Sequence, residues 1–294
     1  MFIRFNGFEA GGWGAALQVE DMPSPEDDVE TDRTDVLGMD GQVAGKDYIR
    51  KSVWNITLLV NTYTYDDGMA VVRQVRDAWL DPAVRLGEDP APMDYSKDGL
   101  TWHRVYGRPV KYGGPPQGTR LDQGVAHIEL QFEQLRVPHY SVTPSTTRLG
   151  AVAGRASLGW ATPFQFPLVS GYLSDPVDTS LTNDGNLPAP LTVTFGGAMT
   201  EPRITNLQDD VVIGIKGELR WDERITVDAL NHNVYFWRTG SPGARTPAPG
   251  RLIRQSRLKR LNAAPGVTDW QLRYASADDG FAVLSINSAY SSMQ

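Results

Sequence analysis

Two segments in the first half of the chain place an apolar residue at every second position. In residues 53–60 every second residue is apolar, namely Trp54, Ile56, Leu58 and Val60. Residues 125–134 repeat the pattern without exception, with Ala126, Ile128, Leu130 and Phe132 on the apolar side. Because successive side chains of a strand point to opposite faces, both segments are predicted to be half-buried strands. Shorter alternating runs at residues 13–20 and 101–106 predict two more.

Between these strands the hydrophobic period changes from two to between three and four. The apolar residues Met69, Val72, Val75 and Trp79 form the stripe of an amphipathic helix. Asp66 or Asp67 supplies a cap for the free amides at its start, and Pro82 prevents its continuation. The pattern therefore predicts one short helix near residues 67–80, which covers an open end or face of a sheet.

The second half consists of short apolar runs separated by turn residues. An Asn-Asp-Gly-Asn turn at residues 183–186 leads into a strand in which Leu191, Val193 and Phe195 share one face. The predicted strands of this half are residues 164–168, 191–195, 211–215, 219–227, 234–237, 269–274 and 281–288. Such a series, with turn signals between its members, is typical of an antiparallel β-sandwich.

Small, polar and proline residues at 138–158 separate the two halves and are typical of a linker. We therefore predict a mainly β protein with an N-terminal β-sandwich domain at residues 1–140 that contains the short helix. A linker at residues 141–157 and a C-terminal β-sandwich domain at residues 158–294 follow.

Composition agrees with this fold and excludes several classes of protein. The 29 glycines and 20 prolines suit short strands joined by turns, and the absence of cysteine excludes a disulfide framework and a cysteine-type zinc site. The net charge of −7 argues against binding to a nucleic-acid backbone. No signal peptide and no membrane helix is recognisable, so we expect the product to be made and kept in a cytoplasm unless a host cell releases it.

The turn and strand sequences of the second half resemble one known family. They are NDGNLPAPLTVTFGG at residues 183–197, EPRITN at 201–206 and WDERITVD at 221–228, and they are similar to the C-terminal domain of the distal tail proteins of long-tailed bacteriophages, also called minor tail proteins. The strand and helix order of the first half, including GRP at residues 107–109, resembles the N-terminal domain. The closing segments LNAAPG at 261–266 and NSAY at 287–290 extend the resemblance over nearly the whole chain.

The resemblance implies a structural virion protein of the distal tail tip, made in a bacterial host cytoplasm. N-terminal domains would form a homohexameric ring around the tail channel, and galectin-like C-terminal domains would project outward. One face would meet the tail-tube protein, and the other the tail-tip or baseplate hub or a tail-associated lysin, with DNA as passing cargo. The resemblance implies no catalysis, no cofactor and no metal.

The residues themselves support no catalytic or metal site. The histidines His103, His127, His139 and His232 lie far apart, and His127 and His232 are expected to face solvent. Acidic pairs at residues 209–210, 222–223 and 278–279 are usual turn formers, although glycoside hydrolysis also needs two carboxyl groups. The acidic run at residues 21–32 is most simply a solvated loop, since the ligand spacing of a calcium loop is missing.

Two clusters are candidates for binding surfaces. Five cations lie close together in the acidic chain and form either a solvated face or a dock for an acidic partner: Arg251, Arg254, Arg257, Lys259 and Arg260. They are expected in a short helix or an edge strand. Four aromatic residues either pack in the core, which the usual burial of tryptophan favours, or stack weakly on sugars: Trp221, Tyr235, Trp237 and Trp270. The alternative functions are accordingly a carbohydrate-binding module that attaches a virion or enzyme to a cell surface, or a glycan hydrolase.

Overall fold

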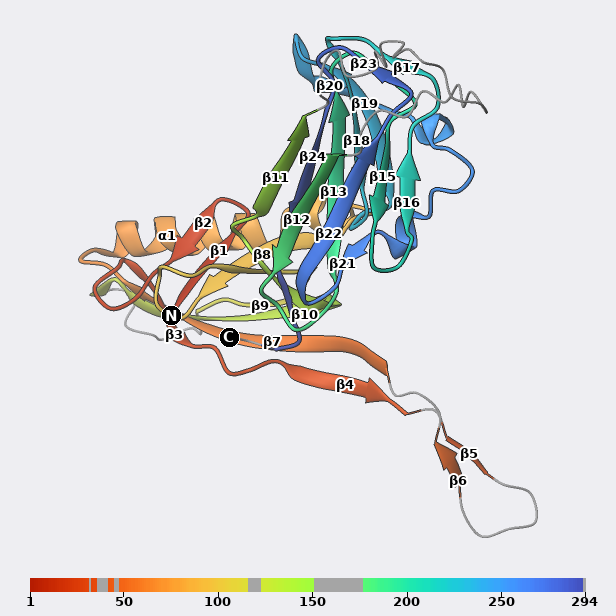
Figure 1. The fold of residues 1–294 in the computed structure, drawn as a ribbon. Coiled ribbons are helices and arrows are strands. Elements are labelled where there is room, and N and C mark those ends of the chain that lie inside the picture. Colours follow the sequence, from red (N-terminus) through yellow and green to blue (C-terminus); the bar gives the residue numbers. More distant parts are fainter. Residues whose placement is uncertain (32, 36–41, 45–47, 116–122, 151–176, 293–294) are drawn as a thin grey trace, which may run out of the picture. The chain divides into compact units, whose positions relative to one another are not determined.

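The chain folds into two compact units (Figure 1). The computed structural model describes residues 1–31, 33–35, 42–44, 48–115, 123–150 and 177–292. The first unit comprises Met1–Val142 with Ser291–Gln294, and the second unit comprises Thr143–Tyr290. Each unit is built from antiparallel strands, so the predicted mainly β fold class is confirmed.

The first unit contains a strongly curled sheet in the order β2-β1-β8-β9-β10-β7-β3. Its strands are β1 (Phe2–Phe5), β2 (Phe8–Ala10), β3 (Leu17–Asp21), β7 (Tyr48–Asn61), β8 (Ala91–Ser96), β9 (His103–Gly113) and β10 (Val125–Ser141). Gly11 donates its amide to the carbonyl of Leu17 over 2.9 Å and forms a bridge with Gln18, so the two ends of this order meet. The sheet is therefore close to a barrel. Further strands are β4 (Glu26–Glu30), which pairs with β7, and the hairpin of β5 (Arg33–Asp35) with β6 (Gln42–Ala44).

The two segments become part of β7 and β10 and pair with each other. Their register sets Trp54 opposite Phe132 and Leu58 opposite Ile128. The eight residues predicted on the apolar faces of these strands are at most 3% exposed. The sequence pattern thus predicted both strands and the face that each one buries.

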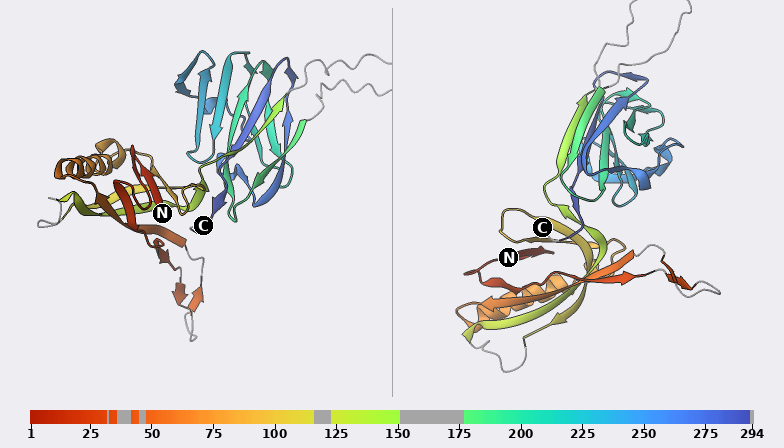
Figure 2. Two further views of the ribbon diagram at one scale, coloured as in Figure 1. Left: turned by 90° about the vertical axis from the view of Figure 1, so that its left-hand side faces the viewer. Right: turned by 60° about the horizontal axis from the view of Figure 1, so that its bottom comes forward.

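The predicted helix is α1 (Tyr65–Trp79), and it lies against β2, β7, β9 and β10 (Figure 2). Its cap is Thr64, whose hydroxyl accepts a hydrogen bond from the Asp67 amide, so the expectation of an Asp66 or Asp67 cap was wrong. Trp79 is fully buried, with its ring 4.9 Å from that of Phe5, and its indole nitrogen donates to the carbonyl of Lys111. Pro82 then begins a second, single-turn helix, α2 (Pro82–Arg85).

The second unit contains a large, a medium and a small sheet. The large sheet has the order β11-β24-β13-β18-β19-β20, the medium sheet has the order β12-β22-β15-β16, and the small sheet has the order β17-β14-β23. The strands of the large sheet are β11 (Ser145–Gly150), β13 (Ala189–Gly196), β18 (Glu223–Asp228), β19 (Asn233–Arg238), β20 (Ser241–Pro247) and β24 (Phe281–Ile286), with β21 (Asn262–Ala263) beside β13. The remaining strands are β12 (Val177–Asn183), β14 (Met199–Thr200), β15 (Arg203–Asn206), β16 (Val212–Gly214), β17 (Glu218–Leu219), β22 (Gly266–Arg273), β23 (Ser276–Ala277) and β25 (Ala289–Tyr290).

The core of the second unit lies on the apolar faces of these strands. Leu191, Val193 and Phe195 of β13 have no exposed surface, as the alternation predicted. Val193 lies opposite Val227 of β18, and Phe195 lies opposite Ile225. Trp270 of β22 is equally buried. The large sheet and the medium sheet therefore each contribute one apolar face to the interior of this unit.

Four predicted segments differ from the structure. Of the strand expected at residues 13–20, only residues 17–20 belong to β3, and residues 13–16 form a turn and a bend. Residues 26–30, expected in a solvated loop, form β4 because they pair with β7. Residues 145–150 of the predicted linker form β11, which pairs with β24. The predicted strand at residues 219–227 is interrupted by a turn at residues 221–222, between β17 and β18. The remaining linker residues 151–157 and the predicted strand at 164–168 lie outside the described residues.

Burial of Trp79 predicts a large effect on stability. Trp79→Ala should lower the free energy of unfolding of the first unit by about 3–5 kcal/mol, because it leaves a cavity against the sheet. Urea denaturation followed by circular dichroism measures the change. The control Arg73→Ala, on the exposed side of α1, should change the free energy by less than about 0.5 kcal/mol. Equal effects of the two substitutions would contradict the packing role of Trp79.

Candidate interaction surfaces

Three of the five predicted cations lie in single-turn 3-10 helices, and Arg254 and Arg257 lie in the residues between these helices; neither an α-helix nor an edge strand forms there. These turns are η2 (Pro249–Arg251) and η3 (Leu258–Arg260). Arg251 is half-buried, and its guanidinium donates to the carbonyl of Glu218 over 2.9 Å. The other four cations are exposed. We call these four, Arg254, Arg257, Lys259 and Arg260, the basic surface.

The segment that carries the basic surface is held firmly against the second unit. The amide of Ile253 donates to the carbonyl of Gly214 over 2.9 Å, and the hydroxyl of Ser256 accepts from the amide of Gly214 over 3.0 Å. Leu261 is fully buried at the end of the segment, where its carbonyl accepts from the Leu191 amide. The backbone beneath the cations is thus fixed.

The cations of the basic surface have no ionic partner in the part of the chain that is described. The ion pairs formed by described residues involve other arginines and lysines, such as Arg4 with Glu9 and Arg238 with Glu223. The charge of the basic surface is therefore not neutralised by a described neighbour.

The structure separates the four aromatic candidates. Trp270 has no exposed surface and lies in the core, so its proposed stacking on sugars was wrong. A ring without an exposed face cannot contact a ligand. Tyr235 and Trp237 are half-buried and lie two residues apart on β19, on the side opposite the buried Val234. The indole nitrogen of Trp237 donates to the hydroxyl of Thr226 on the neighbouring strand over 3.1 Å.

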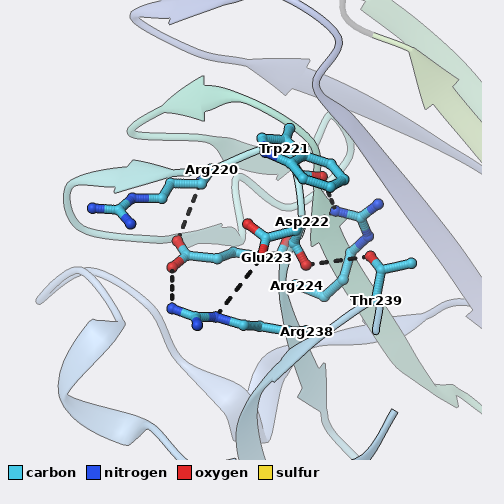
Figure 3. A network of polar contacts seen from close by, with 7 residues as sticks. All are labelled: Arg220, Trp221, Asp222, Glu223, Arg224, Arg238 and Thr239. Carbon is cyan, nitrogen blue, oxygen red and sulfur yellow. Dashed lines mark hydrogen bonds and ion pairs between the residues drawn. The ribbon is translucent and has the colours of Figure 1, made fainter. Parts of the chain in front are cut away.

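Trp221 is the exposed member of this set, at 70% of its surface, and it lies in the turn before β18. A polar network surrounds the turn (Figure 3). Glu223 is buried and accepts hydrogen bonds from the backbone amide of Arg220 at 3.2 Å and from the Arg238 guanidinium at 3.4 Å. The Arg224 guanidinium donates to the carbonyl of Trp221 over 2.9 Å. The network thus fixes the backbone on which the Trp221 ring is presented.

Sequence reasoning missed a cationic contact on the outward side of the same sheet. The guanidinium carbons of Arg148 and Arg224 lie 4.1 and 4.9 Å from the centre of the Phe281 ring. Gly196 permits this packing, because a Cβ atom there would lie 2.4 Å from Cδ of Arg224. The three residues come from β11, β18 and β24, and no spacing in the sequence brings such distant residues together.

The acidic pairs have structural roles in or beside turns, as predicted. Asp222 lies in the turn before β18, and its carbonyl accepts the Thr239 amide over 2.9 Å. Asp279 lies in a bend and accepts the Ala198 amide over 2.8 Å. Asp210, with a φ of 53°, lies next to the turn between β15 and β16. These acidic residues thus lie in or beside the connections between strands, and the carboxylate of Asp279 and the backbone carbonyl of Asp222 each accept a hydrogen bond there.

The histidines do not converge on one site. His127 and His232 are exposed as predicted, and His127 lies 2.8 Å from a carboxylate oxygen of Glu20. His103 and His139 are buried beside Tyr95, whose hydroxyl is 2.7 Å from Nδ1 of His139. Among the described residues, no group of three histidine, aspartate or glutamate side chains is arranged to hold a metal ion. Likewise, none of the described helices has the length and apolar composition needed to cross a membrane.

Comparison with known proteins gives matches in structure and none in sequence. No protein-family model and no curated protein matches the chain. The SPP1 Dit (gp 19.1) protein, described as a paradigm of the hub adsorption apparatus in phages that infect Gram-positive bacteria, matches with a TM-score of 0.60 and 13% identity over 97% of both chains. A chain of the phage P2 baseplate in its activated conformation with Ca matches with a TM-score of 0.57 and 10% identity, over 97% of this chain and 96% of that chain. The Sr form of that baseplate gives a TM-score of 0.55 and 10% identity over 96% of each chain.

These matches confirm the predicted resemblance at the level of the fold. Both units are included, because the alignments cover nearly the full length of the chain. The fold is thus that of phage distal tail and baseplate hub proteins. At 10–13% identity, the likeness extends to the fold and leaves activity to be argued separately.

The buried His103 predicts that the first unit loses stability in mild acid. Its ring stacks on that of Tyr95 with 5.5 Å between centres, and burial lowers the pKa of His103 below its usual value near 6.5. Below that pH the unfolded chain binds more protons than the folded one, so stability should fall as the pH decreases from about 7.5 to 5. One such proton contributes at most about 1.4 kcal/mol per pH unit.

Urea denaturation at several pH values measures this dependence. His103→Gln should flatten it, whereas His127→Gln should leave it in place, because His127 is exposed. An unchanged dependence in His103→Gln would show that another group is responsible.

Proposed function

We propose that this protein is a structural component of a phage tail tip. It would form a homohexameric ring that joins the distal end of the tail tube to the tail-tip or baseplate hub, and it would act by assembly without catalysis. The observation that supports this most is the near-complete structural coverage of a hub protein and a baseplate chain by both units together. A match confined to one β-sandwich would say little, since unrelated proteins share such folds.

The domain roles follow from the same proposal. The first unit, with the curled sheet and α1, forms the ring, and the second unit projects from it. The tail-tube protein binds one face of the ring, and the hub or a tail-associated lysin binds the other. Each subunit then needs two different surfaces that complement each other around a closed ring. No ligand or cofactor enters this function.

The mass of the purified full chain tests the ring. Light scattering should give a particle of about six times 32.4 kDa, and negative-stain images should show a ring with a central hole. Because ring closure can depend on neighbours, the same measurement is repeated after mixing with the tail-tube protein. A chain that stays monomeric in both samples would contradict the ring.

A second candidate function is carbohydrate binding by the second unit, which would attach the virion to a cell surface. The supporting observation is the exposed indole of Trp221, held on a fixed turn, together with the half-buried Tyr235 and Trp237 on β19. Aromatic side chains offer a large apolar face to a sugar ring, and the indole N–H and phenol O–H can form hydrogen bonds beside it. A hydrolytic role receives no such support, since the acidic pairs stabilise turns.

Binding to purified cell-wall polysaccharide tests this candidate. Trp221→Ala and Trp237→Ala should each weaken binding by up to about tenfold. Tyr63→Ala is the matched control, because Tyr63 is a fully exposed aromatic residue of the first unit. Equal binding by all three variants would contradict a sugar site at these rings.

A further inference from the structure

The outward face of the large sheet in the second unit carries aromatic and cationic side chains at adjacent register positions. Trp237 of β19 lies opposite Arg224 of β18, and Arg224 lies opposite Gly196 of β13. Gly196 in turn lies opposite Phe281 of β24. Arg224 and Phe281 alternate with fully buried residues of their own strands, such as Ile225 beside Arg224. They therefore belong to the side of the sheet that faces away from the core.

Arg224 reaches the Phe281 ring across the position of a glycine. A Cβ atom at Gly196 would clash with Cδ of Arg224 and would lie 2.9 Å from Cζ of Phe281. The guanidinium carbon of Arg224 lies 4.9 Å from the centre of the Phe281 ring. The guanidinium carbon of Arg148, on β11, lies 4.1 Å from the same centre. Two cations from distant parts of the sequence are thus held at one aromatic ring.

The two guanidinium groups are not neutralised by an ion pair. Neither Arg148 nor Arg224 forms one with any residue that the structure describes. Burial lowers the pKa of Arg224, and the positive charge of Arg148 acts in the same direction. The carboxylates of Asp279 and Asp222 raise this pKa, but Asp279 accepts a backbone amide and Asp222 lies 3.9 Å from Nε of Arg238. Because arginine keeps its charge at neutral pH, an anion at this pair would relieve the repulsion between the two cations.

Aromatic rings flank these arginines. The half-buried Trp237 donates its indole N–H to the hydroxyl of Thr226 over 3.1 Å, and that hydroxyl lies 3.0 Å from the hydroxyl of Thr194. On the turn before β18, the carbonyl of the exposed Trp221 accepts a hydrogen bond from the Arg224 guanidinium (Figure 3). One cation is therefore bonded to the residue that presents the exposed indole. Aromatic faces suit a sugar ring, and a guanidinium fork matches a carboxylate or a phosphate with two hydrogen bonds.

We propose that this face of the second unit binds a polysaccharide whose sugars carry carboxylate or phosphate groups. Trp221 and Trp237 contact sugar rings, and Arg148 and Arg224 bind the anionic group. The inference rests on the second candidate function, carbohydrate binding, and specifies the charge of the glycan. A neutral sugar would displace water from the two cations without supplying a counterion, so it would bind less tightly.

Binding of the full chain to three forms of one polymer tests the charge of the ligand. Unmodified, phosphorylated and carboxymethylated dextran share a sugar backbone, so the attached group is what differs. In biolayer interferometry at about 0.15 M salt, one anionic form should bind about tenfold more tightly than the unmodified form, because hydrogen bonds to charged groups are strong. The form that binds more tightly identifies the group as phosphate or carboxylate.

Replacement of the arginines tests where the anion binds. Arg148 is exposed, and Arg148→Gln should weaken the binding of the tighter anionic dextran about fivefold, as expected for one exposed charge pair. Arg148→Gln with Arg224→Gln should weaken it about tenfold or more and leave the binding of unmodified dextran unchanged. Circular dichroism checks that the double variant is folded, since Arg224 also holds the Trp221 turn.

The basic surface supplies the matched control, because it is the rival site for an anionic polymer in the same unit. Arg254→Gln with Arg257→Gln removes the same number of charges from exposed positions. At about 0.15 M salt this variant should bind the anionic dextran within about twofold of the wild type, since distant exposed charges are screened. Weakening equal to that of the Arg148 and Arg224 variant would show general attraction to positive charge and would overturn the proposal.

The purified cell-wall polysaccharide separates this inference from carbohydrate binding itself. If Trp221→Ala weakens binding to it while Arg148→Gln with Arg224→Gln does not, the charge inference is overturned and carbohydrate binding stands. If neither that polysaccharide nor any dextran is bound, both are overturned. The proposed ring is tested by its mass and is independent of either result.

Discussion

The pairing of β7 with β10 is the constraint on which the first unit depends. A strand has a side-chain period of two, so a slip of one residue would turn Trp54, Ile56 and Leu58 away from the interior. The observed register instead places these residues opposite Phe132, Leu130 and Ile128, all of them buried. The long paired strands then support β3 and β4 on one side and β9 on the other. Helix α1 packs on this sheet through the ring of Trp79, which contacts the ring of Phe132 on β10.

In the second unit a single polar side chain has a comparable role. Asn183 is 1% exposed, and its amide nitrogen donates to the carbonyls of Leu187 and Ala263 while its oxygen accepts the Gly185 amide. A Cβ atom at Gly185 would lie 1.9 Å from the carbonyl oxygen of Ala289. The Asn-Asp-Gly-Asn sequence therefore joins separate segments of this unit. This motif, which is part of the predicted family resemblance, thus has a structural role in the chain.

The candidate interaction surfaces consist of exposed charged and aromatic side chains on hydrogen-bonded turns, whereas the core is formed by buried apolar side chains. The basic surface consists of cations in and just before the 3-10 helix η3, and Trp221 is presented by a turn whose hydrogen bonds involve Glu223 and Arg224. The structural matches to the SPP1 Dit protein and to a phage P2 baseplate chain concern the fold, which the cores of the two units determine.

The sequence by itself determined the elements with a strong period: β7, β10, β13 and α1, together with the faces that they bury. In a strand or helix the spacing of the apolar residues decides which face is buried, so a regular spacing predicts both the element and its buried face. Tertiary structure alone decided where weakly patterned segments go. Residues 26–30 become a strand because β7 extends beside them. For Trp270 the sequence left both core packing and sugar stacking open, with core packing favoured, and the structure places its side chain in the core. The contact of Arg148, Arg224 and Phe281 depends on three strands from distant parts of the chain, and only long-range pairing brings these strands together.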